Sequence, residues 1–149
     1  MDVLQMHNEL MATLQAVPAL AGHVYDGYVP DKLPTDNAGY ILPYVVVFSG
    51  LSTDLEAERD LTGLVDTTVH DWAPQTTCVG PTPAHARNCA QLVQAALTNA
   101  RIGNHWLKPD TDAFRVAVPL IDNQVTPARF FLPLPWRLTT TSGGPRGNP

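Results

Sequence analysis

Residues 21–50 read AGHVYDGYVPDKLPTDNAGYILPYVVVFSG and contain two stretches with the composition of β-strands. The first covers about 23–29 and the second about 43–49, where tyrosine, valine and phenylalanine predominate. About a dozen residues join them, whereas adjacent strands are usually joined by about two to five. Loops of this length are often functional, so we expect loop 30–41 to be a contact surface.

A helix is predicted before these strands, over residues 2–17. Its apolar residues recur at three- and four-residue steps, which gives one apolar stripe. Asp2 can cap the first turn, with Gln5 three residues on as the second member of a capping box. Pro18 ends the helix because it cannot continue the backbone hydrogen bonds.

A second helix is predicted to begin after Thr82, a favourable N-cap, with Pro83 in its first turn. An alanine-rich apolar stripe follows, which lets the helix lie close to a sheet. Arg101 suits a helix C-terminus, and we expect Gly103 to end the segment.

Three further strands are predicted, at 65–79 with a break at 73–75, at 113–121 and at 128–138. In the last of them large apolar residues alternate strictly, while Pro133 and Pro135 share the opposite parity. One edge of this strand therefore lacks two N–H donors, so we expect it at the edge of the sheet.

The predicted order is one helix, three strands, a helix and two strands, which indicates an α+β fold. We expect an antiparallel or mixed sheet of about five strands with both helices on one face and long loops between strands. Strands adjacent in sequence should pair antiparallel. We expect residues 1–138 to form a single domain and residues 139–149 to be a flexible Gly/Pro tail that cannot bury a core.

Composition and charge exclude several classes of function. The net charge is −5, and the nine Lys and Arg residues are spread singly along the chain, so sequence-specific nucleic-acid binding is not indicated. The spaced apolar residues and charges of the N-terminal segment exclude a signal peptide, and no apolar run reaches membrane-spanning length. We therefore expect a protein made in a cytoplasm that does not bind membranes.

No catalytic, cofactor or metal signature is present. The five histidines include no pair with metal-ligand spacing on a helix. Cys78 with Asp71 and either His70 or His85 is the one conceivable nucleophilic set, and it keeps a small cytoplasmic enzyme as an alternative. A packed thiol is the simpler interpretation of Cys78.

The candidate interface residues lie in loop 30–41, in the acidic segment 51–64, at Trp72 and in the tail. We expect segment 51–64 to be an exposed loop. Trp72 follows a strand beside Ala73-Pro74, which suggests an exposed anchor, because interfaces favour tryptophan. The candidates are Asp31, Lys32, Leu33, Asp36, Tyr40, Asp54, Glu56, Glu58, Arg59, Asp60, Trp72 and Arg146.

The segments AGHVYDGYVP, PYVVVFSG, TTCVG and ARNCAQLVQAAL, in this order after an N-terminal helix, give the chain a family likeness. It resembles the tail terminator (tail completion) proteins of long-tailed bacteriophages over about residues 1–138. These are patterns of elements and not catalytic signatures.

The resemblance implies a homohexameric ring that caps the head-proximal end of the tail tube, stops its polymerisation and joins the tail to the head. Its partners would be further copies of itself, the major tail tube protein and the head-side connector or stopper protein, while DNA passes through the bore without specific binding. It implies no enzymatic activity and no cofactor, assembly in the host bacterial cytoplasm and a place in the virion at the tail neck. Another neck protein, a stopper or head-completion protein, is the alternative of the same class.

Overall fold

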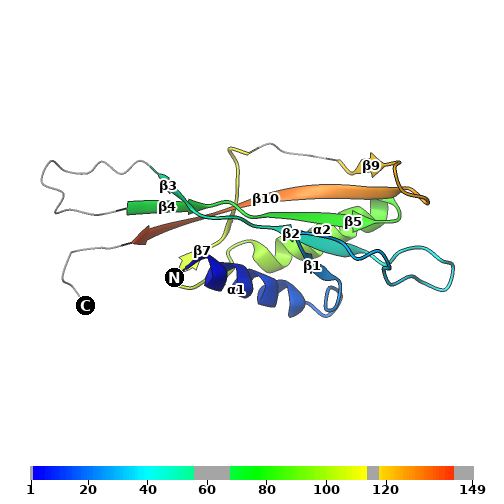
Figure 1. Cartoon of the computed structure of the whole chain (residues 1–149), viewed down its shortest axis with the longest axis horizontal. Coiled ribbons are helices and arrows are strands. Elements are labelled where there is room, and N and C mark those ends of the chain that lie inside the picture. The colour runs from blue at the N-terminus through cyan, green and yellow to red at the C-terminus, as the bar shows by residue number, and fades with distance from the viewer. Residues whose placement is uncertain (1, 56–67, 114–117, 143–149) are drawn as a thin grey trace, which may run out of the picture.

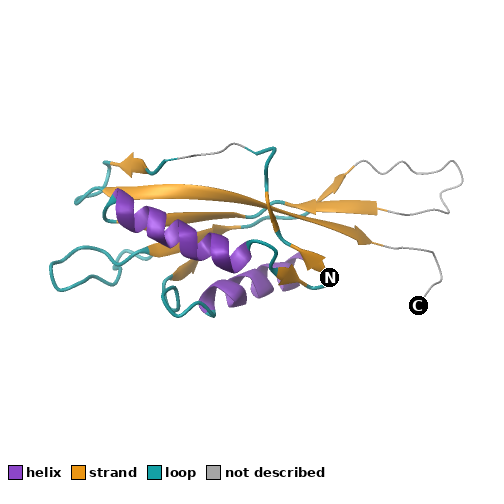
Figure 2. Ribbon diagram, turned by 180° about the vertical axis from the view of Figure 1, so that it is seen from behind, coloured by secondary structure: helices purple, strands orange, loops and turns teal. Residues whose placement is uncertain are grey.

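Two helices lie on one face of an elongated mixed β-sheet in the computed structural model, which describes residues 2–55, 68–113 and 118–142 (Figures 1 and 2). The predicted α+β fold class is confirmed, with both helices on the same face and no closed barrel. The elements are α1 (Val3–Gln15), β1 (Val24–Asp26), β2 (Tyr44–Phe48), β3 (Thr53–Leu55), β4 (Thr68–Trp72), β5 (Gln75–Gly80), α2 (Pro83–Leu97), β6 (Arg101–Ile102), β7 (His105–Trp106), β8 (Lys108–Pro109), β9 (Leu120–Asp122) and β10 (Arg129–Ser142).

The body of the sheet consists of β10, of β4 with β5, and of β2 with β3. β10 pairs antiparallel with β5 and then with β4 in one unbroken register, from Phe130 opposite Gly80 to Ser142 opposite Thr68. β4 and β5 therefore act as one long strand. β2 and β3 pair with the other side of β5 and β4 respectively. β1 lies outside β2, while β9 and β8 lie outside β10, and β6 and β7 form a separate hairpin.

β1 and β2 pair in parallel, with Val24 opposite Val45, which corrects the expectation of antiparallel neighbours. A parallel pair needs a crossover of about a dozen or more residues, because the chain must return to the end at which the first strand began. The length of the join between these strands thus has a structural cause. Its length alone is not evidence of function.

Helix α1 is defined by local signals at its start. The Asp2 carboxylate accepts a hydrogen bond from the Gln5 backbone N–H (2.8 Å), and the capping box predicted from the sequence is complete. Met6, Leu10 and Leu14 are buried in the main apolar core between the helices and the sheet. Burial of each such side chain contributes about 1.5–3 kcal/mol, which is enough to hold a 13-residue helix in place.

Helix α2 begins as predicted and ends earlier than predicted. Thr82 caps it by accepting from the His85 N–H (3.2 Å), and Pro83 occupies the first turn. The helix stops at Leu97, and Asn99 then adopts φ +62°, a left-handed conformation that asparagine tolerates. The chain turns there into the β6–β7 hairpin, which the sequence pattern did not indicate.

The last strand continues to Ser142, so residues 139–142 belong to the sheet, which corrects the expectation of a flexible tail from residue 139. The position of this strand agrees with the edge prediction only in its middle. The Trp136 N–H donates to the Pro74 carbonyl (2.9 Å), so even-numbered residues of β10 face β4 and β5, and both prolines face the other edge. On that edge no described strand pairs with residues 132–135. β9 and β8 pair there with residues 129–131 and 136–137, so β10 has neighbours on both sides.

Two apolar clusters hold the layers together. The larger fills the space between the helices and the sheet, and Trp72 and Trp136 are its largest fully buried members. The smaller lies on the opposite face of the sheet and consists of Ile41, Tyr44, Val46 and Val79. No described helix covers that face. Val29 and Leu33 pack on this second cluster instead, and they hold the base of loop 30–41 there.

Candidate interaction surface

Loop 30–41 is a small ordered hairpin. A β-bridge joins Thr35 and Ile41, and the Leu42 N–H donates to the Pro34 carbonyl (3.0 Å). At its tip the Asp36 carboxylate accepts from the Ala38 and Tyr40 N–H groups (2.9 and 3.0 Å). Such an Asx-type turn uses a short acidic side chain in place of a backbone acceptor, so Asp36 gives the tip one conformation.

The base of the loop is fastened to the helix-free face of the sheet. Leu33 and Val29 pack against the second apolar cluster. Arg129 donates to the Tyr44 hydroxyl (3.2 Å) in the same region, and burial raises the pKa of Tyr44 above its usual value. Leu33 is therefore mainly an internal support of the loop. Of the predicted interface residues here, Asp31, Lys32, Asp36 and Tyr40 are exposed.

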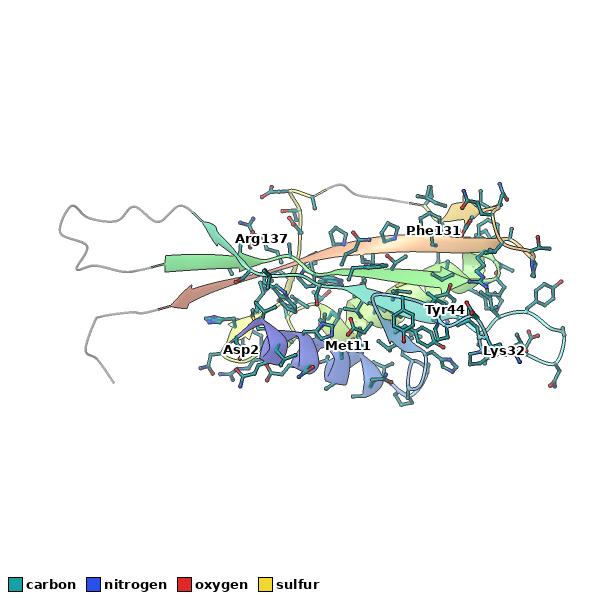
Figure 3. All side chains as sticks on the ribbon, viewed as in Figure 1. Asp2, Met11, Lys32, Tyr44, Phe131 and Arg137 are labelled. Atoms are coloured by element: carbon teal, nitrogen blue, oxygen red, sulfur yellow. The ribbon has the colours of Figure 1, made fainter. Side chains whose placement is uncertain are left out.

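Exposed aromatic rings make this loop suited to binding a protein. Tyr40 is 50% exposed, and Tyr28, which the sequence analysis did not select, is 75% exposed. Tyrosine is enriched at interfaces because its rigid ring gives a large contact area at low entropic cost. Figure 3 shows Lys32 on the part of the loop that projects beyond the sheet. We call Tyr28, Asp31, Lys32 and Tyr40 the loop-end surface.

A short strand at the same end of the molecule adds exposed apolar groups. β9 lies at the end of the sheet from which loop 30–41 projects (Figure 1). Leu120 is 39% exposed and Ile121 51% exposed. Exposed apolar side chains close together commonly mark an interaction site. The predicted strand 113–121 signalled this segment, but not that both faces of the strand would remain uncovered.

The opposite end of the sheet carries β3, at the start of the acidic segment 51–64. Asp54 lies on strand β3, which corrects the expectation that residues 51–64 form only a loop. Glu56, Glu58, Arg59 and Asp60 lie outside the described residues, as does Arg146. β3 and β4 lie at the end of the sheet opposite to the loop-end surface.

Trp72 is not an exposed anchor, and that prediction is wrong. Its side chain is 1% exposed, lies on the helix side of the sheet opposite Leu138, and donates from Nε1 to the Gly50 carbonyl (3.1 Å). Trp106 is the exposed tryptophan instead, at 55%, with the Arg101 guanidinium 5.7 Å from its ring centre. The sequence pattern could not show which of Trp72 and Trp106 is exposed, because it did not predict the β6–β7 hairpin that carries Trp106.

The Cys-His-Asp interpretation finds no support at Cys78. This thiol is fully buried, and its pKa is raised well above the usual value by the hydrogen bond with Cys89 and by burial. Nucleophilic cysteines need the thiolate form and access to substrate. His85 lies at the start of α2, where its Nδ1 is 2.6 Å from the Thr82 hydroxyl.

We predict that neither cysteine reacts with a thiol reagent in the native protein. At pH 8 a colorimetric disulfide reagent should modify no thiol rapidly, and both should react once the chain is unfolded, because burial blocks access and disfavours the thiolate. Rapid modification of one thiol per native chain would contradict this expectation and reopen the nucleophile hypothesis.

Ser49, His7 and Asp26 form a hydrogen-bonded row that sequence reasoning missed. His7 Nδ1 lies 2.6 Å from Ser49 Oγ, and His7 Nε2 lies 3.1 Å from Asp26 Oδ2. The order of groups is that of a serine hydrolase triad. The Asp26 side chain is 65% exposed, and neither of the two described cavities is lined by these residues. These two contacts therefore connect α1 to the ends of β1 and β2 and have a structural role.

Two cavities open on the β10 side of the molecule. The larger, about 690 Å³, lies between α2 and the proline-bearing edge of β10, and Arg87 and Asp110 are its charged lining residues. The smaller, about 420 Å³, lies beside the β6–β7 hairpin. Among the described residues no three His, Cys, Asp or Glu side chains are grouped to hold a metal ion. None of the described helices is long and apolar enough to span a membrane.

Comparison with known proteins gives matches among solved structures. No protein-family model matches the chain, and no curated protein matches it. Among solved structures, a chain of the "Virion of native gene transfer agent (GTA) particle" is 24% identical, with a TM-score of 0.40, over 88% of this chain and 92% of that chain. Because identity and TM-score are this low, we base the functional proposal on the chain's own surfaces.

Proposed function

We propose that this chain is a structural virion protein of a long-tailed bacteriophage, a tail terminator. In this proposal it forms a homohexameric ring at the tail neck. The ring caps the head-proximal end of the tail tube, stops tube polymerisation and joins the tail to the head-side connector. It acts without catalysis or a cofactor, and it is assembled in the host bacterial cytoplasm.

The single observation that carries the proposal is a rigid sheet with chemically unlike ends. β10 has 14 residues, so the sheet is roughly 45 Å long. One end presents the ordered loop-end surface with two exposed tyrosines. The other end carries β3 with Asp54, and we call it the acidic end because the sequence after Asp54 is rich in acids. A protein that joins two different partners needs two different surfaces facing opposite ways, and we assign the loop end to the tube and the acidic end to the connector.

Charge supports passage of DNA without specific binding. The chain carries a net charge of −5, so a polyanion is not retained. Arg137, on the helix-free face of the sheet, is held by ion pairs to Asp71 (2.8 Å) and Asp112 (3.3 Å). A guanidinium neutralised in this way contributes little to phosphate binding.

Tube capping tests the proposal directly. Purified tail tube protein would be polymerised with increasing amounts of this chain, and tube lengths measured by electron microscopy. We predict that the double variant Tyr28→Ser/Tyr40→Ser needs about a thousandfold more protein to cap, because two interface tyrosines at about 2 kcal/mol each contribute about 4 kcal/mol. Leu4→Ser, which removes a 66% exposed leucine from α1, is the control and should cap normally.

The outcomes separate the alternatives. If the double variant caps as well as the wild type, the tube contact lies elsewhere on the chain. If the wild-type chain neither caps tubes nor occurs in virions, the proposed function is wrong. Electron cryo-microscopy of the neck distinguishes a single ring on the tube from stacked rings of a tube protein. A ring on the head side alone would indicate a stopper or head-completion protein.

A further inference from the structure

Three strands at the acidic end of the sheet extend beyond both helices. They are β3, β4 and residues 138–142 of β10, joined by antiparallel ladders from Thr53 opposite Asp71 and from Leu138 opposite Trp72. Figures 1 and 2 show that neither α1 nor α2 lies over the outer part of these strands. We call them the sheet arm. A small sheet is stabilised by an apolar face or by a helix packed on it, and no described helix covers this part, so the sheet arm is a candidate for contact with a neighbour.

Both edges of the sheet arm are open within the described part of the chain. The described strands give β3 one neighbour, β4, and give residues 138–142 the same neighbour on their inner side. Because the Trp136 N–H points to the β4–β5 side, residues of odd number point outward. The N–H groups of Thr139 and Thr141 thus face the open edge.

The open edge of β10 at residues 138–142 lacks the features that block strand pairing in the middle of β10. Proteins protect exposed edges with proline, lysine or very short strands. Pro133 and Pro135 occupy the outward positions in the middle of β10, and the two-residue strand β8, Lys108–Pro109, covers the next part. Residues 138–142 read Leu-Thr-Thr-Thr-Ser, with neither proline nor charge. This part of the edge is competent to pair with another strand.

We propose that the outer edge of residues 138–142 pairs with the outer edge of β3 in a second copy of this chain. β3 and β10 are each antiparallel to β4, so they run in the same direction. Rotation about an axis roughly along the strands brings β10 of one copy beside β3 of the next in parallel. The two edges differ, so the contact is heterologous, and it closes into a ring when the rotation between copies divides a full turn.

The proposed pairing depends on the ring proposed above as the function of this chain. In that ring the paired sheet arms would line a central channel. Six sheet arms supply about eighteen strands, the number found in barrels that enclose a water-filled channel. With strands about 4.8 Å apart and tilted by about 40°, such a barrel is about 36 Å across between backbones. That is wide enough to pass a DNA duplex.

A proline at an outward position tests the pairing. Thr141→Pro removes an N–H that β4 does not use, as Pro133 and Pro135 do naturally, so the monomer should keep its melting temperature within about 5 °C. Assembled rings on tube ends, counted by electron microscopy, should fall at least about tenfold, because each interface loses a backbone hydrogen bond and gains a clash. Thr141→Val keeps the N–H and should assemble normally.

Cross-linking gives a readout that does not depend on the proline variant folding. Leu55 and Thr141 both lie opposite Val69, so these two positions share one face and one level of the sheet. In Leu55→Cys/Thr141→Cys, mild oxidation of ring-capped tubes should produce a ladder of disulfide-linked oligomers, and either single variant should not. The native cysteines are 0% and 1% exposed and cannot contribute. Normal ring assembly by Thr141→Pro without a ladder would overturn the pairing. A cross-link to the tube protein would assign the edge to that partner and also overturn it.

These outcomes are distinct from failure of the proposed function. A wild-type chain that never caps tubes refutes the terminator proposal itself. A wild-type chain that caps tubes while Thr141→Pro caps them equally refutes only the edge pairing.

Discussion

Replacing Trp136 by alanine should lower the free energy of unfolding of this protein by about 3–5 kcal/mol. The indole is 1% exposed in the main core, and truncation of a buried aromatic side chain costs about 3–5 kcal/mol. Its Nε1 donates to the Thr76 hydroxyl (2.9 Å), and Thr76 is itself 0% exposed. The variant therefore loses packing and weakens the hydrogen bonding of a buried hydroxyl. Domains of this size are stabilised by about 5–15 kcal/mol in total, so this loss is a large share.

Urea unfolding followed by circular dichroism measures the effect of Trp136→Ala. Trp106→Ala is the matched control, because Trp106 is 55% exposed and has one described stacking contact, with Arg101. The control should lose about 1 kcal/mol or less. If the two variants were equally stable, the assignment of Trp136 to the core would be wrong.

Gly80→Ala should destabilise the protein by about 2–3 kcal/mol, although it adds only a methyl group. A Cβ at position 80 would lie 2.7 Å from the His85 Cβ and 2.8 Å from the Ala86 backbone nitrogen. The second contact is with the main chain of α2, which cannot rotate away as a side chain can. The helix must shift from β5, and the packing of its alanine-rich face is lost.

Gly50→Ala is the control for Gly80→Ala. A Cβ at Gly50 would meet no atom within 4 Å, so alanine fits there and should leave stability unchanged or raise it by about 0.4–1 kcal/mol. The same unfolding experiment compares the two variants. Opposite signs are expected, and a Gly80→Ala protein as stable as the wild type would show that α2 does not pack against β5 this closely.

The helix starts and the candidate loop were predictable because their causes lie within a few residues of each other. Asp2 with Gln5 and Thr82 with Pro83 are local capping signals, and the structure confirms both. Loop 30–41 stood out by its length and turn residues, and its exposed Asp31, Lys32 and Tyr40 remain candidate contacts.

The pairing of strands was less predictable because it depends on partners distant in sequence. The parallel pairing of β1 with β2 and the position of β10 between β5 and the short outer strands come from contacts between distant segments. The end of α2 also differed, because Asn99 turns the chain into a hairpin that packs beside α1, where the Gly103 N–H donates to Glu9.

By itself the sequence determined the α+β class, both helix starts and the alternation that places Leu132, Leu134 and Leu138 on the buried side of β10. Those features depend on local hydrogen bonds and on the two-residue period of a strand. Only the tertiary structure decided that Trp72 is buried while Trp106 is exposed. Burial depends on which element covers a side chain, and that covering element is brought in by the rest of the fold.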